Sequence, residues 1–112
     1  RSNKNAGFDH IPYIGGSSIE VSDHYKPVNQ SERVPGDIKI VTIRDSNGKV
    51  IDGHGMIYNG SKSSKEFYEM SSSGMKANKD YMEDYYISRY KGKMQSGEYT
   101  MESGYYRPLE KQ

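Results

Sequence analysis

Three histidines are the side chains of this chain best suited to proton transfer, and each lies close to an aspartate in the sequence. The pairs are Asp9 with His10, Asp23 with His24, and Asp52 with His54. Imidazole and carboxylate groups can ligate a metal ion, and a carboxylate can orient an imidazole. Compact metal-ligand spacings such as HExxH are absent, so we expect neither a metal site nor a cofactor. We expect His10 and His24 to be solvated surface residues.

His54 differs from the other two because Gly53 and Gly55 flank it at the expected start of a strand. Glycine permits close approach by a substrate backbone or a neighbouring chain, and a strand holds the imidazole on a rigid element. Such a placement suits a general base. The alternative is a histidine that simply begins a strand after a glycine turn, and the residues alone do not decide between the two.

Glu69 lies at the centre of the next expected strand, where antiparallel pairing would bring it beside His54. A carboxylate at that position fixes the imidazole tautomer and stabilises the protonated ring, as the acid of a catalytic triad does. This interpretation needs Phe67 and Glu69 on one face of the strand and Tyr68 and Met70 on the other. The alternative is a solvent-exposed Glu69, since a one-residue slip in register would exchange the two faces.

Strand and turn signals surround these residues. Residues 37–43 are rich in β-branched side chains and follow a Pro-Gly turn, which predicts a strand. Asn47-Gly48 predicts a tight hairpin turn, and residues 49–51 begin the return. Further strands are expected at 53–58 and 65–71. Short connections between neighbouring strands favour an antiparallel meander.

Two helices and a strand-forming tail are also expected. A capping-box spacing predicts a short helix over about 18–25. A second helix is expected to start at a cap formed by Asn78, and an alternative is a strand over 85–90. Its expected face against the sheet consists of Met82, Tyr85, Tyr86 and Tyr90. Residues 98–101 and 104–108 predict one or two short edge strands, because a proline near the end is tolerated there.

Composition limits the functional classes. The chain has 112 residues, the size of one domain, and 16 basic against 15 acidic residues give a net charge of +1. No basic block indicates a nucleic-acid partner, and no apolar segment is long enough for a membrane helix. The hydrophobic fraction is only 32%, with Leu109 as the sole leucine, although 11 tyrosines add apolar area. Cysteine is absent, which excludes disulfides, thiolate metal sites and a cysteine nucleophile within this chain.

Two motifs and the strand that follows them carry a family resemblance. The motifs are Val-Pro-Gly-Asp-Ile at 34–38 and Asp-Gly-His-Gly-Met-Ile-Tyr-Asn-Gly at 52–60, and the strand has a central polar residue. In this order they resemble the NlpC- and CHAP-type cell-wall cysteine peptidases. Residues 6–12 and the closing Tyr-Tyr-Arg-Pro at 105–108 are also similar. The resemblance implies an α+β, papain-like antiparallel sheet with short helices. By position, it implies that His54 is the catalytic base and Glu69 the residue that orients it.

The chain departs from this family in lacking the nucleophilic cysteine, which the family carries on a helix before the first strand. Two interpretations follow. Residues 1–112 are a single domain or the C-terminal part of one papain-like amidase domain whose cysteine lies on another segment, or they are a degenerate member without chemistry. The low content of aliphatic residues favours the first interpretation, because the missing helix would complete the hydrophobic core of a fragment. Ser17 and Ser18 suit a helix cap better than a nucleophile.

The resemblance also implies partners and a location. The expected partners are an N-terminal cysteine-bearing segment or chain, a peptidoglycan peptide and, for a secreted toxin, an inhibitory immunity protein. Phage lysins and bacterial toxins of this kind are secreted or delivered to the periplasm or cell wall. Two alternatives stay open from the residues: a non-catalytic wall- or glycan-binding module whose tyrosines stack on sugars, and a structural subunit of a phage or secretion assembly.

Overall fold

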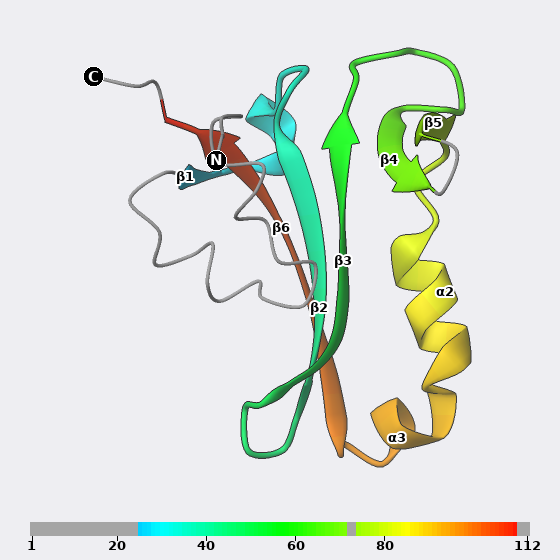
Figure 1. Cartoon of the computed structure of the whole chain (residues 1–112). Helices are drawn as coiled ribbons and strands as arrows, with labels where there is room; N and C mark the ends of the chain where they lie inside the picture. Colours follow the sequence, from blue (N-terminus) through cyan, green and yellow to red (C-terminus); the bar gives the residue numbers. More distant parts are fainter. Residues whose placement is uncertain (1–24, 72–73, 110–112) are drawn as a thin grey trace.

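The computed structural model describes residues 25–71 and 74–109, which form one antiparallel sheet with short helices (Figure 1). The six strands lie in the order β1-β6-β2-β3-β4-β5. They are β1 (Tyr25–Val28), β2 (Ile38–Asp45), β3 (Val50–Tyr58), β4 (Phe67–Ser71), β5 (Gly74–Asn78) and β6 (Tyr99–Pro108). The described helices are the 3-10 turn η2 (Gln30–Glu32) and the α-helices α2 (Met82–Arg89) and α3 (Lys91–Gln95).

This architecture is mainly β, so the expected α+β, papain-like fold class is wrong. The two α-helices of the described residues are only eight and five residues long. Two residues assigned to expected helices lie in strands instead: Tyr25, the last residue of the first expected helix, begins β1, and Asn78, the expected cap of the second, ends β5. At Asn78, cross-strand pairing with β4 outweighs the local capping signal. The rest of the helix expected over 18–25 lies outside the described residues.

The predicted meander is confirmed from β2 to β4. Gly48 takes a φ of 83° in the hairpin turn, and its N–H donates to the Asp45 carbonyl. β3 then runs without a break from Val50 to Tyr58, where two strand pieces had been expected. In the register of β2 and β3, Val41 lies opposite His54.

The second predicted helix exists but begins later than expected. Asn78 ends β5, and α2 starts at Met82. Met82 and Tyr86 are buried against the sheet, as the spacing predicted, whereas Tyr85 is exposed. The alternative strand over 85–90 is wrong.

The tail forms one ten-residue strand, β6. Tyr105 and Tyr106 pair with both β1 and β2, so the prediction of an edge strand over 104–108 is wrong. Among the described strands, residues 99–101 pair only with β2, as expected of an edge strand. β6 lies between β1 and β2. Its pairing with β2 extends only to Tyr106, and Pro108 therefore needs no hydrogen bond to that strand. The edge strand that contains a proline is β1, at Pro27.

Strand alternation divides the core into two clusters. One face of the sheet packs against α2 through a cluster formed by Val41, Ile43, Met56, Phe67, Met82, Tyr86 and Tyr105. The other cluster is formed by Tyr25, Ile38, Ile40 and Tyr106. His54 shares the parity of Met56 on β3, so its side chain lies on the face that α2 covers.

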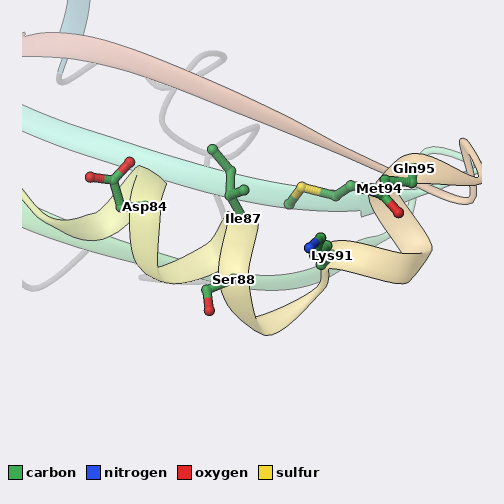
Figure 2. A pocket seen from close by; sticks show the side chains of 6 residues that line it. All are labelled: Asp84, Ile87, Ser88, Lys91, Met94 and Gln95. Carbon is green, nitrogen blue, oxygen red and sulfur yellow. The ribbon is translucent and has the colours of Figure 1, made fainter.

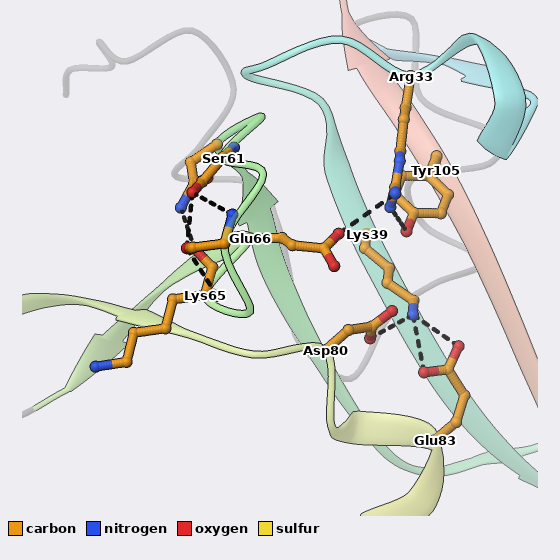
Figure 3. A network of polar contacts seen from close by, with 10 residues as sticks. Arg33, Lys39, Ser61, Lys65, Glu66, Asp80, Glu83 and Tyr105 are labelled. Atoms are coloured by element: carbon orange, nitrogen blue, oxygen red, sulfur yellow. Dashed lines mark hydrogen bonds and ion pairs between the residues drawn. The ribbon is translucent and has the colours of Figure 1, made fainter.

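A buried lysine fixes the start of α2 to the sheet (Figure 3). Lys39 on β2 is only 4% exposed, and its Nζ lies 2.7 Å from an Asp80 oxygen and 2.8 Å from Glu83. Burial alone would lower the pKa of Lys39, but hydrogen bonds to the two carboxylates raise it. The ammonium group therefore stays charged and holds the segment before α2 in place.

The Pro-Gly-Asp turn is fixed by a second buried charge. Asp37 is 1% exposed, and its carboxylate accepts the Val34 N–H at 2.8 Å. Arg107 on β6 donates to both Asp37 oxygens, from Nε at 2.9 Å and from Nη2 at 3.0 Å. Burial would raise the pKa of Asp37, but the bonds from Arg107 and Val34 lower it below its ordinary value of 3.8.

Asp37→Asn is expected to lower the free energy of unfolding at neutral pH by about 2 kcal/mol, because it leaves Arg107 without its anion. The folded-state pKa of Asp37 is depressed, so its contribution is present above the ordinary pKa and is lost as pH falls through the folded value. Urea denaturation at neutral and acid pH measures both effects, and the difference between the proteins should shrink in acid. Asp84→Asn, at an exposed aspartate, is the control. Equal effects of the two substitutions would contradict the assignment.

Candidate functional site

His54 and Glu69, predicted from the sequence to lie together, are in direct contact. The Nε2 atom of His54 is 2.9 Å from Oε1 of Glu69. Backbone pairing between β3 and β4 covers only two residue pairs, Ile57 with Tyr68 and Tyr58 with Phe67. The two site residues therefore meet through their side chains, beyond the end of this ladder. The expected sharing of a face by Phe67 and Glu69 is confirmed, since Phe67 is buried while Tyr68 is exposed.

The Glu69 carboxylate is held by two further side chains. Asn78 Nδ2 donates to Oε2 at 2.6 Å, and the Tyr81 hydroxyl contacts Oε1 at 2.8 Å and Oε2 at 3.1 Å. The Glu69 side chain is 11% exposed. Burial alone would raise the pKa of Glu69, but hydrogen bonds from Tyr81, Asn78 and His54 lower it below its ordinary value. The carboxylate is thus a fixed anion.

This environment determines which nitrogen of His54 can act as a base. An anionic Glu69 accepts hydrogen bonds only, so the proton of the neutral imidazole lies on Nε2. The lone pair is then on Nδ1. The His54 side chain is 30% exposed, which leaves the ring accessible to a reactant.

Tyr81 is a neutral donor in this arrangement. Burial, followed by its hydrogen bond to Glu69, raises the pKa of Tyr81 to about 12. The hydroxyl therefore keeps its proton through the neutral and mildly alkaline range, and it orients both carboxylate oxygens.

Asp52, the aspartate nearest His54 in the sequence, does not bind His54 but binds two tyrosines of the helical segment. Tyr90 Oη donates to Oδ2 at 2.6 Å, and Tyr86 Oη donates to Oδ1 at 3.2 Å. The Gly53 N–H also donates to Oδ1, at 2.8 Å. The hydrogen bond to Asp52, and then burial, raise the pKa of Tyr90. Asp52 thus fixes α2 to β3 directly beside His54.

His54 opens into a hollow between β3 and α2. Its lining residues are Asp52, Gly53, His54, Tyr81, Met82, Tyr85, Tyr86 and Arg89. Another hollow beside α2 and α3 is lined by Asp84, Ile87, Ser88, Lys91, Met94 and Gln95, and contains no histidine (Figure 2). Of these two hollows, the first contains a histidine whose orientation is fixed by a carboxylate.

Sequence reasoning missed Asn78, Tyr81 and Arg89 as members of the site. Asn78 was interpreted as a helix cap, and Arg89 was not considered as a site residue. Tyr81 carried no signal of its own, because its role depends on where β5 ends. His10 and His24 lie outside the described residues, as do Ser17 and Ser18.

Residues 25–71 and 74–109 contain neither a metal-ligand cluster nor a membrane-spanning helix. No group of three or more histidine, cysteine, aspartate or glutamate side chains is arranged there to hold a metal ion. Within the same ranges, no helix is long and apolar enough to span a membrane.

Comparisons with known proteins found no match. No protein-family model matches the chain, and no curated protein or solved structure is significantly similar to it.

Tyr81→Phe is expected to raise the pKa of Glu69, because the carboxylate loses the donor that contributes most to lowering it. Side-chain ¹³C NMR titration of Glu69 measures the change. Tyr85→Phe is the matched control, since the Tyr85 hydroxyl makes no contact with Glu69 and interacts with Arg89. An unchanged Glu69 pKa in Tyr81→Phe, or equal shifts in both variants, would show that Tyr81 does not hold the carboxylate.

Proposed function

We propose that the chain supplies the general base of a cysteine-dependent amidase or endopeptidase that cleaves peptidoglycan stem peptides. His54 is the base and Glu69 orients it. The observation that carries the proposal is the 2.9 Å contact between His54 Nε2 and Glu69 Oε1 at the edge of an open hollow. The chain has no cysteine, so the nucleophile comes from a separate segment or chain.

The chemistry assigned to the pair is acyl transfer. His54 Nδ1 accepts the proton of the thiol, and the thiolate attacks the carbonyl carbon of the amide. The imidazolium then gives this proton to the leaving amine as the C–N bond breaks and a thioester forms. In the second step His54 accepts a proton from water, whose oxygen attacks the thioester. The acid product leaves, and the thiol recovers its proton from His54.

Contacts among the tyrosines argue against the alternative of a glycan-stacking surface on α2. Tyr86 is 3% exposed, and its ring stacks on that of Tyr90 at a centroid distance of 6.1 Å. The hydroxyls of both tyrosines bind Asp52. The rings of Tyr86 and Tyr90 therefore pack within the protein and offer little surface to a sugar. Tyr85 is the exposed tyrosine of α2.

The 112-residue chain alone is expected to show no hydrolysis of stem peptides, and addition of a cysteine-bearing helical segment is expected to produce it. In the completed enzyme, His54→Ala should reduce turnover by roughly 10²-fold or more, because the general base is lost. Circular dichroism should show nearly unchanged folding, since His54 is partly exposed. His24→Ala is the control for histidine replacement elsewhere in the chain.

Three results would contradict the proposal: cleavage by the chain alone, activity of His54→Ala within a few-fold of the parent, or unfolding of that variant. Glu69→Gln separates charge from size in the same assay. It should lower turnover because the imidazolium loses its anion. Glu102→Gln is the matched control, because Glu102 on β6 is half-exposed and pairs with Arg44, away from the hollow.

A further inference from the structure

Arg89 lies at the end of α2, where two hollows adjoin. One hollow contains His54, and the other is lined by Lys79, Asp80, Tyr81, Asp84, Tyr85, Ser88 and Arg89. Tyr81, Tyr85 and Arg89 line both. The Arg89 side chain is 54% exposed, so the guanidinium is accessible in the lining of the His54 hollow.

The neighbouring Asp52 carboxylate forms only a long ion pair with this guanidinium, without a hydrogen bond. Arg89 Nε is 3.9 Å from Asp52 Oδ2, which is longer than a hydrogen bond. The Asp52 oxygens instead take their closer donors from Tyr86, Tyr90 and the Gly53 N–H. The Asp52 carboxylate therefore interacts mainly with the tyrosines that attach α2 to the sheet, and less with Arg89.

Two tyrosines position Arg89. Its Nη1 donates to the Tyr85 hydroxyl at 3.3 Å, and its Cζ lies 5.4 Å from the centre of the Tyr90 ring. The Tyr90 hydroxyl also accepts a hydrogen bond from Arg89. A guanidinium carries five N–H donors in a planar fork, more than the hydroxyls of Tyr85 and Tyr90 can accept. The remaining donors match the geometry of a carboxylate, which binds such a fork through both oxygens.

We propose that Arg89 binds a carboxylate of the substrate next to the amide that reacts at His54, and so selects anionic stem peptides. This inference rests on the proposed function for its substrate class. Arg89 is the cationic side chain in the lining of the His54 hollow, apart from His54 itself when protonated. A free carboxylate beside the scissile bond would gain an ion pair there, and a carboxamide would not.

Two synthetic tripeptides test the selection: L-alanyl-γ-D-glutamyl-L-lysine with the glutamate α-carboxylate free, and the same peptide with that group as a carboxamide. The completed enzyme should show a kcat/KM about 10-fold higher for the free carboxylate, mainly through KM. Arg89→Gln should abolish this preference. Lys93→Gln removes one positive charge from α3 outside the His54 hollow and should keep it. No preference in the parent, or a preference that survives Arg89→Gln, overturns the proposal.

A binding measurement on the 112-residue chain separates this inference from the proposed function. In an NMR titration, the free-carboxylate peptide should shift the Arg89 Nε–Hε signal at about 10-fold lower concentration than the carboxamide peptide. If the completed enzyme shows no turnover but this difference is present and is lost in Arg89→Gln, the proposed function fails and the carboxylate site stands. If turnover depends on His54 but both peptides bind equally, the carboxylate site fails alone.

Discussion

The Glu69 carboxylate is the group on which the candidate site depends, because it joins three parts of the chain in one buried cluster. Its partners are His54 on β3, Asn78 at the end of β5 and Tyr81 just before α2. An ionised carboxylate so little exposed is stable only when its lone pairs are satisfied, and these three side chains satisfy them. The same bonds that permit the buried anion also fix the orientation of the imidazole. Stability of the cluster and orientation of the His54 ring therefore have one physical origin.

The sheet and α2 are held together by charges placed around this cluster. Lys39 binds Asp80 and Glu83 at the start of α2, and Asp52 binds two tyrosines near its end. α2 is thus attached to the sheet near Tyr81 at its start and near Arg89 at its end. A chain with a hydrophobic fraction of only 32% depends on such buried polar contacts, together with the cores formed by β2, β3 and β6, to place a short helix accurately.

Local signals predicted the β2–β3 hairpin, the strand at Phe67 and the meeting of His54 with Glu69. Alternation places Glu69 on the face of Phe67, and burial of an aromatic residue fixes that face. The fold class and the partners of Glu69 could not be obtained in this way. Asn78 has a helix-capping side chain, but the pairing of β5 with β4, a tertiary effect, decides its conformation. Tyr81 and Arg89 join the site only because α2 begins and ends where it does.

The central claim is that Glu69 fixes the proton of neutral His54 on Nε2 and leaves Nδ1 as the base. ¹⁵N NMR of the His54 ring in the 112-residue chain, compared with Glu69→Gln, tests it most directly. The account predicts a protonated Nε2 whose proton exchanges slowly, an unprotonated Nδ1, and loss of this slow exchange in Glu69→Gln. A ring protonated on Nδ1, or a spectrum that Glu69→Gln leaves unchanged, would contradict it.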